Sequence, residues 1–142
     1  MSAAVAPGAP GVRTLEADAV ADRLRPDLAL IADLVPAGSH VLDLGCGDGE
    51  LLHWLGTHRG VSGYGLENDP RNIEVGIRRG LNVLDQDLDE GLPLFDDDSF
   101  DFVILAQTLQ AMRRPDRLLA EMLRLAPECV VTFRSEERRV GK

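Results

Sequence analysis

The stretch VLDLGCGDG, from Val41 to Gly49, constrains the fold more than any other part of the chain. A short apolar run, expected as a strand over residues 39–44, leads into glycines at 45, 47 and 49, and a helical pattern follows. Glycine permits positive φ and lets a ligand approach the backbone closely. A strand that turns into a helix in this way is typical of open α/β sheets, which bind ligands at the carboxyl ends of their strands. The turn therefore predicts a binding site; the alternative is a tight strand-to-helix connection that binds nothing.

Strand and helix patterns alternate along the rest of the chain. Asp69 and Pro70 combine a capping side chain with proline at the first helical position, and Gly80 is a stop signal. The alternation predicts an α/β fold, a doubly wound and mostly parallel Rossmann-like sheet with helices on both faces. The expected helices cover residues 24–35, 50–58, 70–79 and a segment from Pro115 with an apolar stripe of Leu118, Leu119, Met122, Leu123 and Leu125; the other expected strands cover 61–67, 81–84, 100–106 and 129–133.

Length and composition set the broad class. The chain has 142 residues, which suggests one compact domain. A net charge of −9 argues against a nucleic-acid surface, because phosphate binding needs clustered cations. We expect no membrane contact, because no run of about 18 apolar residues occurs. Two cysteines are too few for a disulfide scaffold and favour a reducing, cytoplasmic setting.

Both ends of the chain differ in composition from its middle. Residues 1–13 are rich in Ala, Gly and Pro, and we expect them to be disordered. The last nine residues, RSEERRVGK, contain the only lysine and resemble the translation of a common sequencing adapter. We therefore expect the domain to cover residues 14–133, to be truncated after Phe133, and to be followed by a non-native tail at 134–142; a genuine basic tail is the alternative.

The residues around the glycines indicate the chemistry of the ligand. The dinucleotide fingerprint requires Gly or Ala where this chain has Glu50, which would crowd and repel a pyrophosphate. Asp43 and Asp48 lie in the same stretch, and no lysine is nearby. This environment favours a cationic or zwitterionic ligand without phosphates, such as S-adenosylmethionine or its product S-adenosylhomocysteine. A nicotinamide dinucleotide is the less favoured alternative.

The VLDLGCGDG stretch resembles the first motif of class I S-adenosylmethionine-dependent methyltransferases. The resemblance implies that Glu67, in GYGLEND, holds the ribose hydroxyls, that Asp87 contacts the adenine, and that Asp43 lies near the methionine end. Asp85 and Asp89 compete with Asp87 for the adenine position. The full set of implied cofactor-binding residues is Asp43, Gly45, Cys46, Gly47, Glu67, Asn68, Asp87, Leu88 and Ala106.

Longer stretches narrow the resemblance. LRPDLALIADLVPAGSHVLDLGCGDGELL, RRGLNVLDQDLDEGL and FDDDSFDFVILAQTLQAMRRPDRLLAEMLR together resemble the MetW family of methionine biosynthesis proteins. This resemblance implies a protein that binds S-adenosylmethionine and acts with homoserine O-acetyltransferase. The alternative is a methyltransferase for a small molecule. The segment from Ala106 to Arg114 has no side chain suited to act as a general base, which favours the binding protein.

Other chemical groups carry weaker signals. The three histidines lack a metal-ligand spacing, and the acidic stretch between Asp85 and Asp101 lacks the pattern of a calcium loop. Cys46 has no neighbouring cation to activate it. We therefore predict no metal site and name no catalytic residue. The expected partner contact, chosen for its proximity to the ligand, comprises Gln107, Gln110, Arg113 and Arg114.

Overall fold

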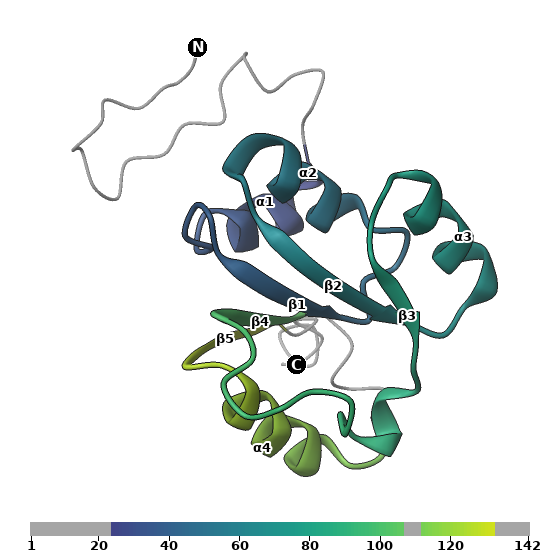
Figure 1. The fold of residues 1–142 in the computed structure, drawn as a ribbon, viewed down its shortest axis with the longest axis vertical. Helices are drawn as coiled ribbons and strands as arrows, with labels where there is room; N and C mark the ends of the chain where they lie inside the picture. Colours follow the sequence, from purple (N-terminus) through teal and green to yellow (C-terminus); the bar gives the residue numbers. More distant parts are fainter. Residues whose placement is uncertain (1–23, 107–111, 133–142) are drawn as a thin grey trace, which may run out of the picture. The chain divides into compact units, whose positions relative to one another are not determined.

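The computed structural model describes residues 24–106 and 112–132 of the chain (Figure 1). The segment at 1–13, the tail at 134–142, and Gln107 and Gln110 lie outside these ranges, so the predictions made for them stay predictions. The chain divides into two compact units, residues 1–36 and 37–142, each of which is described by itself.

The first unit contains one described helix, α1 (Pro26–Ala32), with proline in its first turn as predicted. The helix is shorter than the expected range of 24–35. The amides of Leu34 and Val35 bond to carbonyls three residues back, which tightens the chain into turns after Ala32. Leu34, which follows the helix, is 59% exposed.

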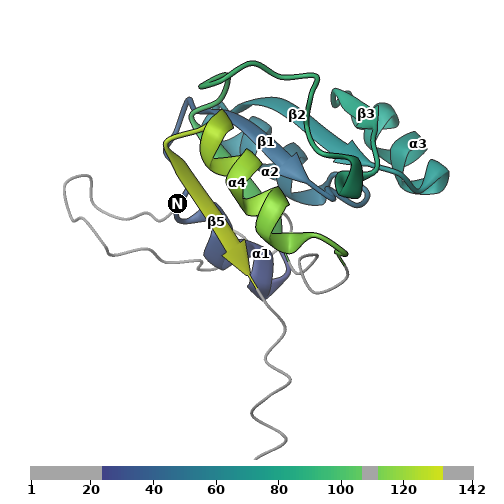
Figure 2. The same cartoon turned by 90° about the horizontal axis from the view of Figure 1, so that it is seen from below.

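The second unit is built on a five-stranded sheet in the order β3-β2-β1-β4-β5, with every pair of neighbours parallel. Figure 1 shows α2 and α3 on one face of this sheet and α4 on the other, and Figure 2 presents the face covered by α4. This arrangement confirms the predicted doubly wound α/β fold. The strands are β1 (His40–Leu44), β2 (Ser62–Glu67), β3 (Val83–Asp85), β4 (Phe102–Ala106) and β5 (Glu128–Thr132).

The helices of the second unit are α2 (Glu50–Arg59), α3 (Pro70–Arg78) and α4 (Pro115–Leu125), with a short 3₁₀ turn, η2 (Leu88–Glu90), after β3. The Asp69 carboxylate caps α3 by accepting from the amide of Arg71, as the sequence predicted.

Gly49, the residue before α2, has a φ of 85°, and a Cβ there would overlap the side chain of Leu81. The backbone angle therefore favours glycine at this position, and a larger residue would also have to displace the Leu81 side chain.

The core on the α4 side of the sheet is formed by side chains that recur at helical spacing. Leu118, Met122 and Leu125 are almost fully buried against β1 and β4, whose own residues are buried over most of their length. Leu123 was predicted to join this stripe, but it is 68% exposed. At 100° per residue it points about 140° away from Leu118, so it lies on the solvent side of the helix.

Two strands begin two residues later than predicted, because the first residue expected in each bonds to a helix end instead of to the sheet. Leu81 was expected to open the third strand, but its amide bonds to the carbonyl of Gly76 and closes the end of α3. Phe100 was expected to open the fourth, but its amide bonds to the carbonyl of Leu125. The apolar runs in the sequence are longer than the paired strands, so the predicted strands begin too early.

The acidic connection between β3 and β4 is fixed by one arginine. Arg124 of α4 donates to the backbone carbonyls of Leu92 and Phe95 at 3.0 and 2.9 Å. It also pairs with the carboxylates of Asp97 and Glu121. Because one guanidinium satisfies acceptors on both sides, it holds this connection against α4.

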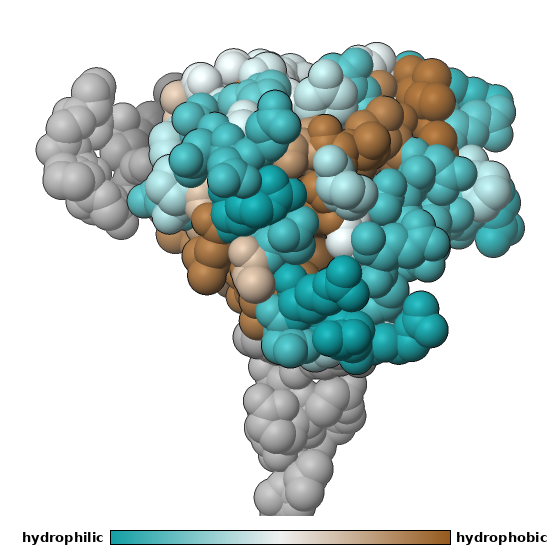
Figure 3. Space-filling view, turned by 60° about the horizontal axis from the view of Figure 1, so that its bottom comes forward, coloured by the Kyte–Doolittle hydropathy of each residue, from teal (hydrophilic) through white to brown (hydrophobic). Residues whose placement is uncertain are grey.

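The surface combines hydrophilic residues with apolar ones. Figure 3 shows one face, on which hydrophobic residues (brown) reach the surface between hydrophilic ones (teal). Among the described residues of the second unit, the exposed large apolar side chains are Ile77, Leu94 and Leu123. Within residues 24–106 and 112–132, no helix has the length and apolar character needed to cross a membrane.

Candidate functional site

A cavity opens at the carboxyl ends of β1, β2 and β3, beside the point where the strand order reverses between β1 and β4. We call it the switch-point cavity. Its volume of about 350 Å³ lies within the range of small-molecule sites. Its lining residues are Gly45, Leu66, Glu67, Asn68, Gln86, Asp87, Leu88, Asp89 and Met112.

The Glu67 carboxylate, at the end of β2, contacts the glycine turn, the residue before α3 and α3 itself. Its Oε1 accepts from the amide of Gly47 at 2.9 Å, and its Oε2 accepts from the amide of Asp69 at 3.2 Å. The Asn72 side-chain amide lies 3.5 Å from Oε2. The glycine turn is therefore tied to β2, while the half-buried carboxylate still lines the cavity. Ionised carboxylates have about four lone-pair sites, so ligand hydroxyls can add to these contacts.

Asp43 lies behind the glycine turn, within β1 and opposite Gly65 of β2 and Ile104 of β4. Its side chain is buried, and the residue is only 3% exposed. Burial, together with the negative charge of Glu67, raises the pKa of Asp43 from 3.8 to about 7. A positive charge placed near this carboxyl would favour its ionised form.

Cys46 is also buried behind the turn, and its amide bonds to the carbonyl of Leu66. Burial is the main cause that raises the pKa of its thiol to about 12, and the charges of Asp43 and Glu67 add to it. A thiol with so high a pKa stays protonated at neutral pH and is a weak nucleophile. This setting agrees with the expectation that no neighbouring cation activates Cys46.

Asp87 and Asp89 both line the cavity, from the connection that follows β3. The Oδ1 of Asp87 caps η2 by accepting from the amide of Asp89, which leaves its second oxygen available. The Asp89 carboxylate accepts from the amide and the guanidinium of Arg113 at 2.9 and 3.3 Å. These contacts, the backbone one first, lower the pKa of Asp89. Asp85 pairs with Glu67 in the β2–β3 ladder and is not part of the lining.

The predicted cofactor residues fall into four groups. Five of them line the switch-point cavity: Gly45, Glu67, Asn68, Asp87 and Leu88. Gly47 reaches it through its bond to Glu67, whereas Asp43 and Cys46 lie behind the turn. Ala106 ends β4 opposite Thr132 of β5 and is not among the lining residues.

Sequence reasoning did not assign Leu66, Gln86 and Met112 to the site, although they line the cavity. Gln86 carries the clearest signal, because it directly precedes Asp87 after a predicted strand. Its side chain donates to the carbonyl of Gly91 at 3.2 Å. Met112 comes from a distant part of the sequence, and only the fold brings it to this edge of the sheet.

The other candidate groups have structural partners. His40 stacks on Phe100 and contacts the Ser62 hydroxyl at 3.0 Å through Nδ1, and His58 stacks on Trp54. In the described ranges, no group of three or more His, Cys, Asp or Glu side chains is arranged to hold a metal ion.

The sheet order, the glycine turn after β1 and the acid at the end of β2 define a protein of the class I methyltransferase type. Within this class, the chain belongs to the MetW family of methionine biosynthesis proteins, whose sequence model matches residues 25–136. A relative from Rhodopirellula baltica, the bifunctional methionine biosynthesis protein MetXA/MetW, is 42% identical over 118 residues. That match covers 78% of this chain and 19% of the relative.

Solved structures support the same fold. A SAM-dependent methyltransferase from Thermotoga maritima is 29% identical with a TM-score of 0.58, and the match covers 70% of this chain and 44% of that one. A methyltransferase from Haloferax volcanii, in complex with the Trm112 methyltransferase activator, is 30% identical with a TM-score of 0.61. The match covers 70% of this chain and 47% of that complex's chain. The chain therefore spans less than half the length of these structures.

Proposed function

We propose that this chain binds S-adenosylmethionine or S-adenosylhomocysteine in the switch-point cavity. The observation that carries the proposal is the set of carboxylates in its lining: Glu67, Asp87 and Asp89, with no basic side chain among the described lining residues. Among the residues that the structure describes, Asp89 is the one of the three with a cationic partner, Arg113. An acidic cavity suits a ligand with ribose hydroxyls, an adenine amine and positive charge, and it disfavours phosphates.

The proposed roles follow from the contacts. Glu67 accepts from the ribose hydroxyls while its bond to Gly47 keeps the turn in place. Asp87 accepts from the adenine amine through the oxygen that does not cap η2. Asp43 and the carbonyls of the glycine turn lie on the side of the methionine moiety, where the deprotonated Asp43 offsets the ligand's positive charge.

Calorimetry on wild type and Glu67→Gln tests the ligand. The exchange keeps one acceptor oxygen but places a donor opposite a ligand hydroxyl, so we expect a loss of roughly tenfold or more in affinity. Glu74→Gln is the matched control, because Glu74 is exposed on α3 and pairs with Arg78. Equal affinities for wild type and Glu67→Gln would remove Glu67 from the site. No binding heat in wild type, with the chain folded by circular dichroism, would refute the ligand.

We further propose that the chain acts with homoserine O-acetyltransferase in methionine biosynthesis, in the cytoplasm. The Rhodopirellula baltica relative supports this, because its name joins MetXA and MetW in one chain. A covalent link keeps two modules at a high effective concentration, so separate chains with the same role need an interface instead. Arg113 is a candidate contact, since its side chain is 79% exposed beside the cavity.

Mixing the chain with the acetyltransferase, with and without S-adenosylmethionine, tests the partnership. A complex that changes the acetylation rate supports it, and any effect of the ligand on partner affinity must be matched by an equal effect of the partner on ligand affinity. The second candidate, methyl transfer to a small molecule, is favoured by the similarity to the SAM-dependent methyltransferase of Thermotoga maritima. Transfer of a labelled methyl group without complex formation would favour that candidate.

A further inference from the structure

A second cavity lies between α2, the start of β2 and the connection from α3 to β3. We call it the α2–β3 cavity. Its volume is about 340 Å³, and it shares no lining residue with the switch-point cavity. It is lined by Ser62, at the beginning of β2, whereas Glu67 ends that strand. The two residues are five positions apart along the strand, or about 16 Å.

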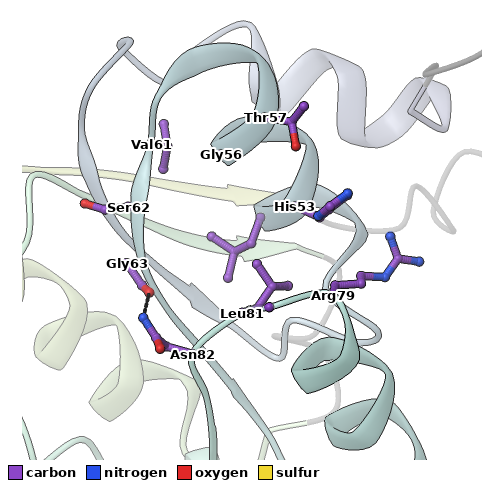
Figure 4. A pocket seen from close by; sticks show the side chains of 11 residues that line it. His53, Gly56, Thr57, Val61, Ser62, Gly63, Arg79, Leu81 and Asn82 are labelled. Atoms are coloured by element: carbon purple, nitrogen blue, oxygen red, sulfur yellow. Dashed lines mark hydrogen bonds between the residues drawn. The ribbon is translucent and has the colours of Figure 1, made fainter.

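The α2–β3 cavity has polar sides and an apolar part between them. Figure 4 shows Thr57, His53 and Arg79 along one side and Asn82 on the other, with Leu81 between. Asn82 is held in place by donating to the carbonyl of Gly63 at 3.3 Å. Leu52 and Val61 add further apolar surface. A ligand with a polar group at one end and an aliphatic body fits this distribution.

Arg79 is the main charged group of the cavity, and its hydrogen-bonding capacity is only partly used. It forms an ion pair with Asp48, whose Oδ2 lies 3.6 Å from Nη2, which is longer than a hydrogen bond. Its Nε is buried and has no acceptor among the residues that the structure describes. A buried donor without a partner is costly, so a shift of the Arg79 side chain that brings Nε to an acceptor would be favoured.

We propose that the α2–β3 cavity is a second binding site that takes a small aliphatic carboxylate. The carboxylate accepts from the guanidinium of Arg79, a geometry for which arginine is well suited. His53 adds a donor on the same side, and the aliphatic body covers Leu81 and Leu52. This inference concerns a different site from the proposed cofactor site and does not rest on it.

Binding of a ligand at this site would also affect the glycine turn, through the contact of Arg79 with Asp48. Asp48, the neighbour of Arg79, belongs to that turn and accepts from the amide of Glu50 at 3.1 Å, which helps to start α2. A ligand that draws Arg79 toward itself weakens its pairing with Asp48. We therefore expect the amide resonances of Gly47 and Gly49 to respond to occupancy along with those of the cavity.

The test is a titration of the full ¹⁵N-labelled chain with hexanoate, followed by amide chemical shifts. We expect saturable shifts at Gly56, Gly80 and Asn82, with no comparable effect of hexylamine, which has the same aliphatic body and the opposite charge. Absence of saturable shifts with hexanoate, or equal binding of hexylamine, would overturn the proposal. S-adenosylmethionine is absent from this experiment, so its outcome is independent of the cofactor site.

Two variants locate the binding. Arg79→Gln removes the charge and should weaken hexanoate binding roughly tenfold or more, whereas Arg78→Gln, an exposed neighbour paired with Glu74, should not. Gly56→Leu should abolish binding by filling the cavity. A Cβ at Gly56 meets only the Val61 carbonyl at 3.5 Å, an ordinary contact, so the added side chain has room to enter. A folded Gly56→Leu chain that binds hexanoate like wild type would refute the location.

Discussion

Replacing Asp43 by Asn should stabilise the chain, and the gain should grow as pH rises. Asp43 lies in the middle of three parallel strands and is 3% exposed. Burial first, and the charge of Glu67 second, raise its pKa from 3.8 to about 7 in the folded chain. A carboxyl with a raised pKa makes the folded state bind a proton more tightly than the unfolded state does. Its ionisation therefore costs stability as pH rises from about 4 to 7.

The size of the effect follows from the two pKa values. A rise from 3.8 to about 7, at about 1.36 kcal/mol for each pH unit, corresponds to roughly 4 kcal/mol at high pH. About 3 kcal/mol of this change falls between pH 5 and pH 8. Asn has nearly the same shape as Asp and does not titrate, so the variant lacks this pH-dependent cost.

Urea unfolding of wild type and Asp43→Asn at pH 5 and at pH 8 measures the effect. We expect the free energy of unfolding of the variant, relative to wild type, to increase by about 3 kcal/mol between the two pH values. Asp116→Asn, which changes an exposed carboxylate in the first turn of α4, is the control and should show little change. A difference between Asp43→Asn and wild type that stays constant with pH would refute the reasoning.

Three further predictions follow from the fold and the site. Arg124→Ala leaves two backbone carbonyls of the acidic connection without their donor, so we expect a loss of about 2–3 kcal/mol in unfolding free energy, with no rescue by Lys; an unchanged urea midpoint would contradict this. Gly49→Ala should destabilise by about 1–2 kcal/mol from its positive φ alone, and displacement of Leu81 adds to the loss; thermal unfolding measures it against Gly56→Ala, a helical position with room. Affinity for S-adenosylmethionine should increase as pH rises through 7, because the ionised Asp43 favours a cation; calorimetry at pH 6 and 8 that gives equal affinities would remove Asp43 from the site.

The sequence predicted those parts of the structure that depend on neighbouring residues. The cap of α3 by Asp69 and Pro70 and the positive φ angles of the glycine turn are local, and the structure has them. Leu81 and Phe100 were placed in strands because apolar runs extend beyond the residues that pair. Their actual partners are carbonyls of helix ends, which a hydrophobic pattern does not indicate.

The site shows the same division between local and distant contacts. Glu67 could be singled out as an acid at the end of a strand, but its bond to Gly47 joins residues twenty positions apart and depends on the pairing of β1 with β2. The sequence did not decide between Asp87 and Asp89 as the residue that contacts the adenine, and both line the cavity. One caps η2 and the other pairs with Arg113, and these roles follow from where the connection meets the sheet.

Asp43 and Glu67 together explain why the site would carry a cost when empty. Glu67 is held by two backbone amides, so its charge has local partners. Asp43 is buried near that charge, and its own ionisation is disfavoured. Residues that reduce stability in this way are common at functional sites, where a ligand offsets the cost. If a cationic ligand does so here, Asp43→Asn should raise the stability of the free chain at pH 8 and weaken S-adenosylmethionine binding in the same buffer. A variant that is more stable and binds equally well would show that the Asp43 carboxyl has no part in recognition.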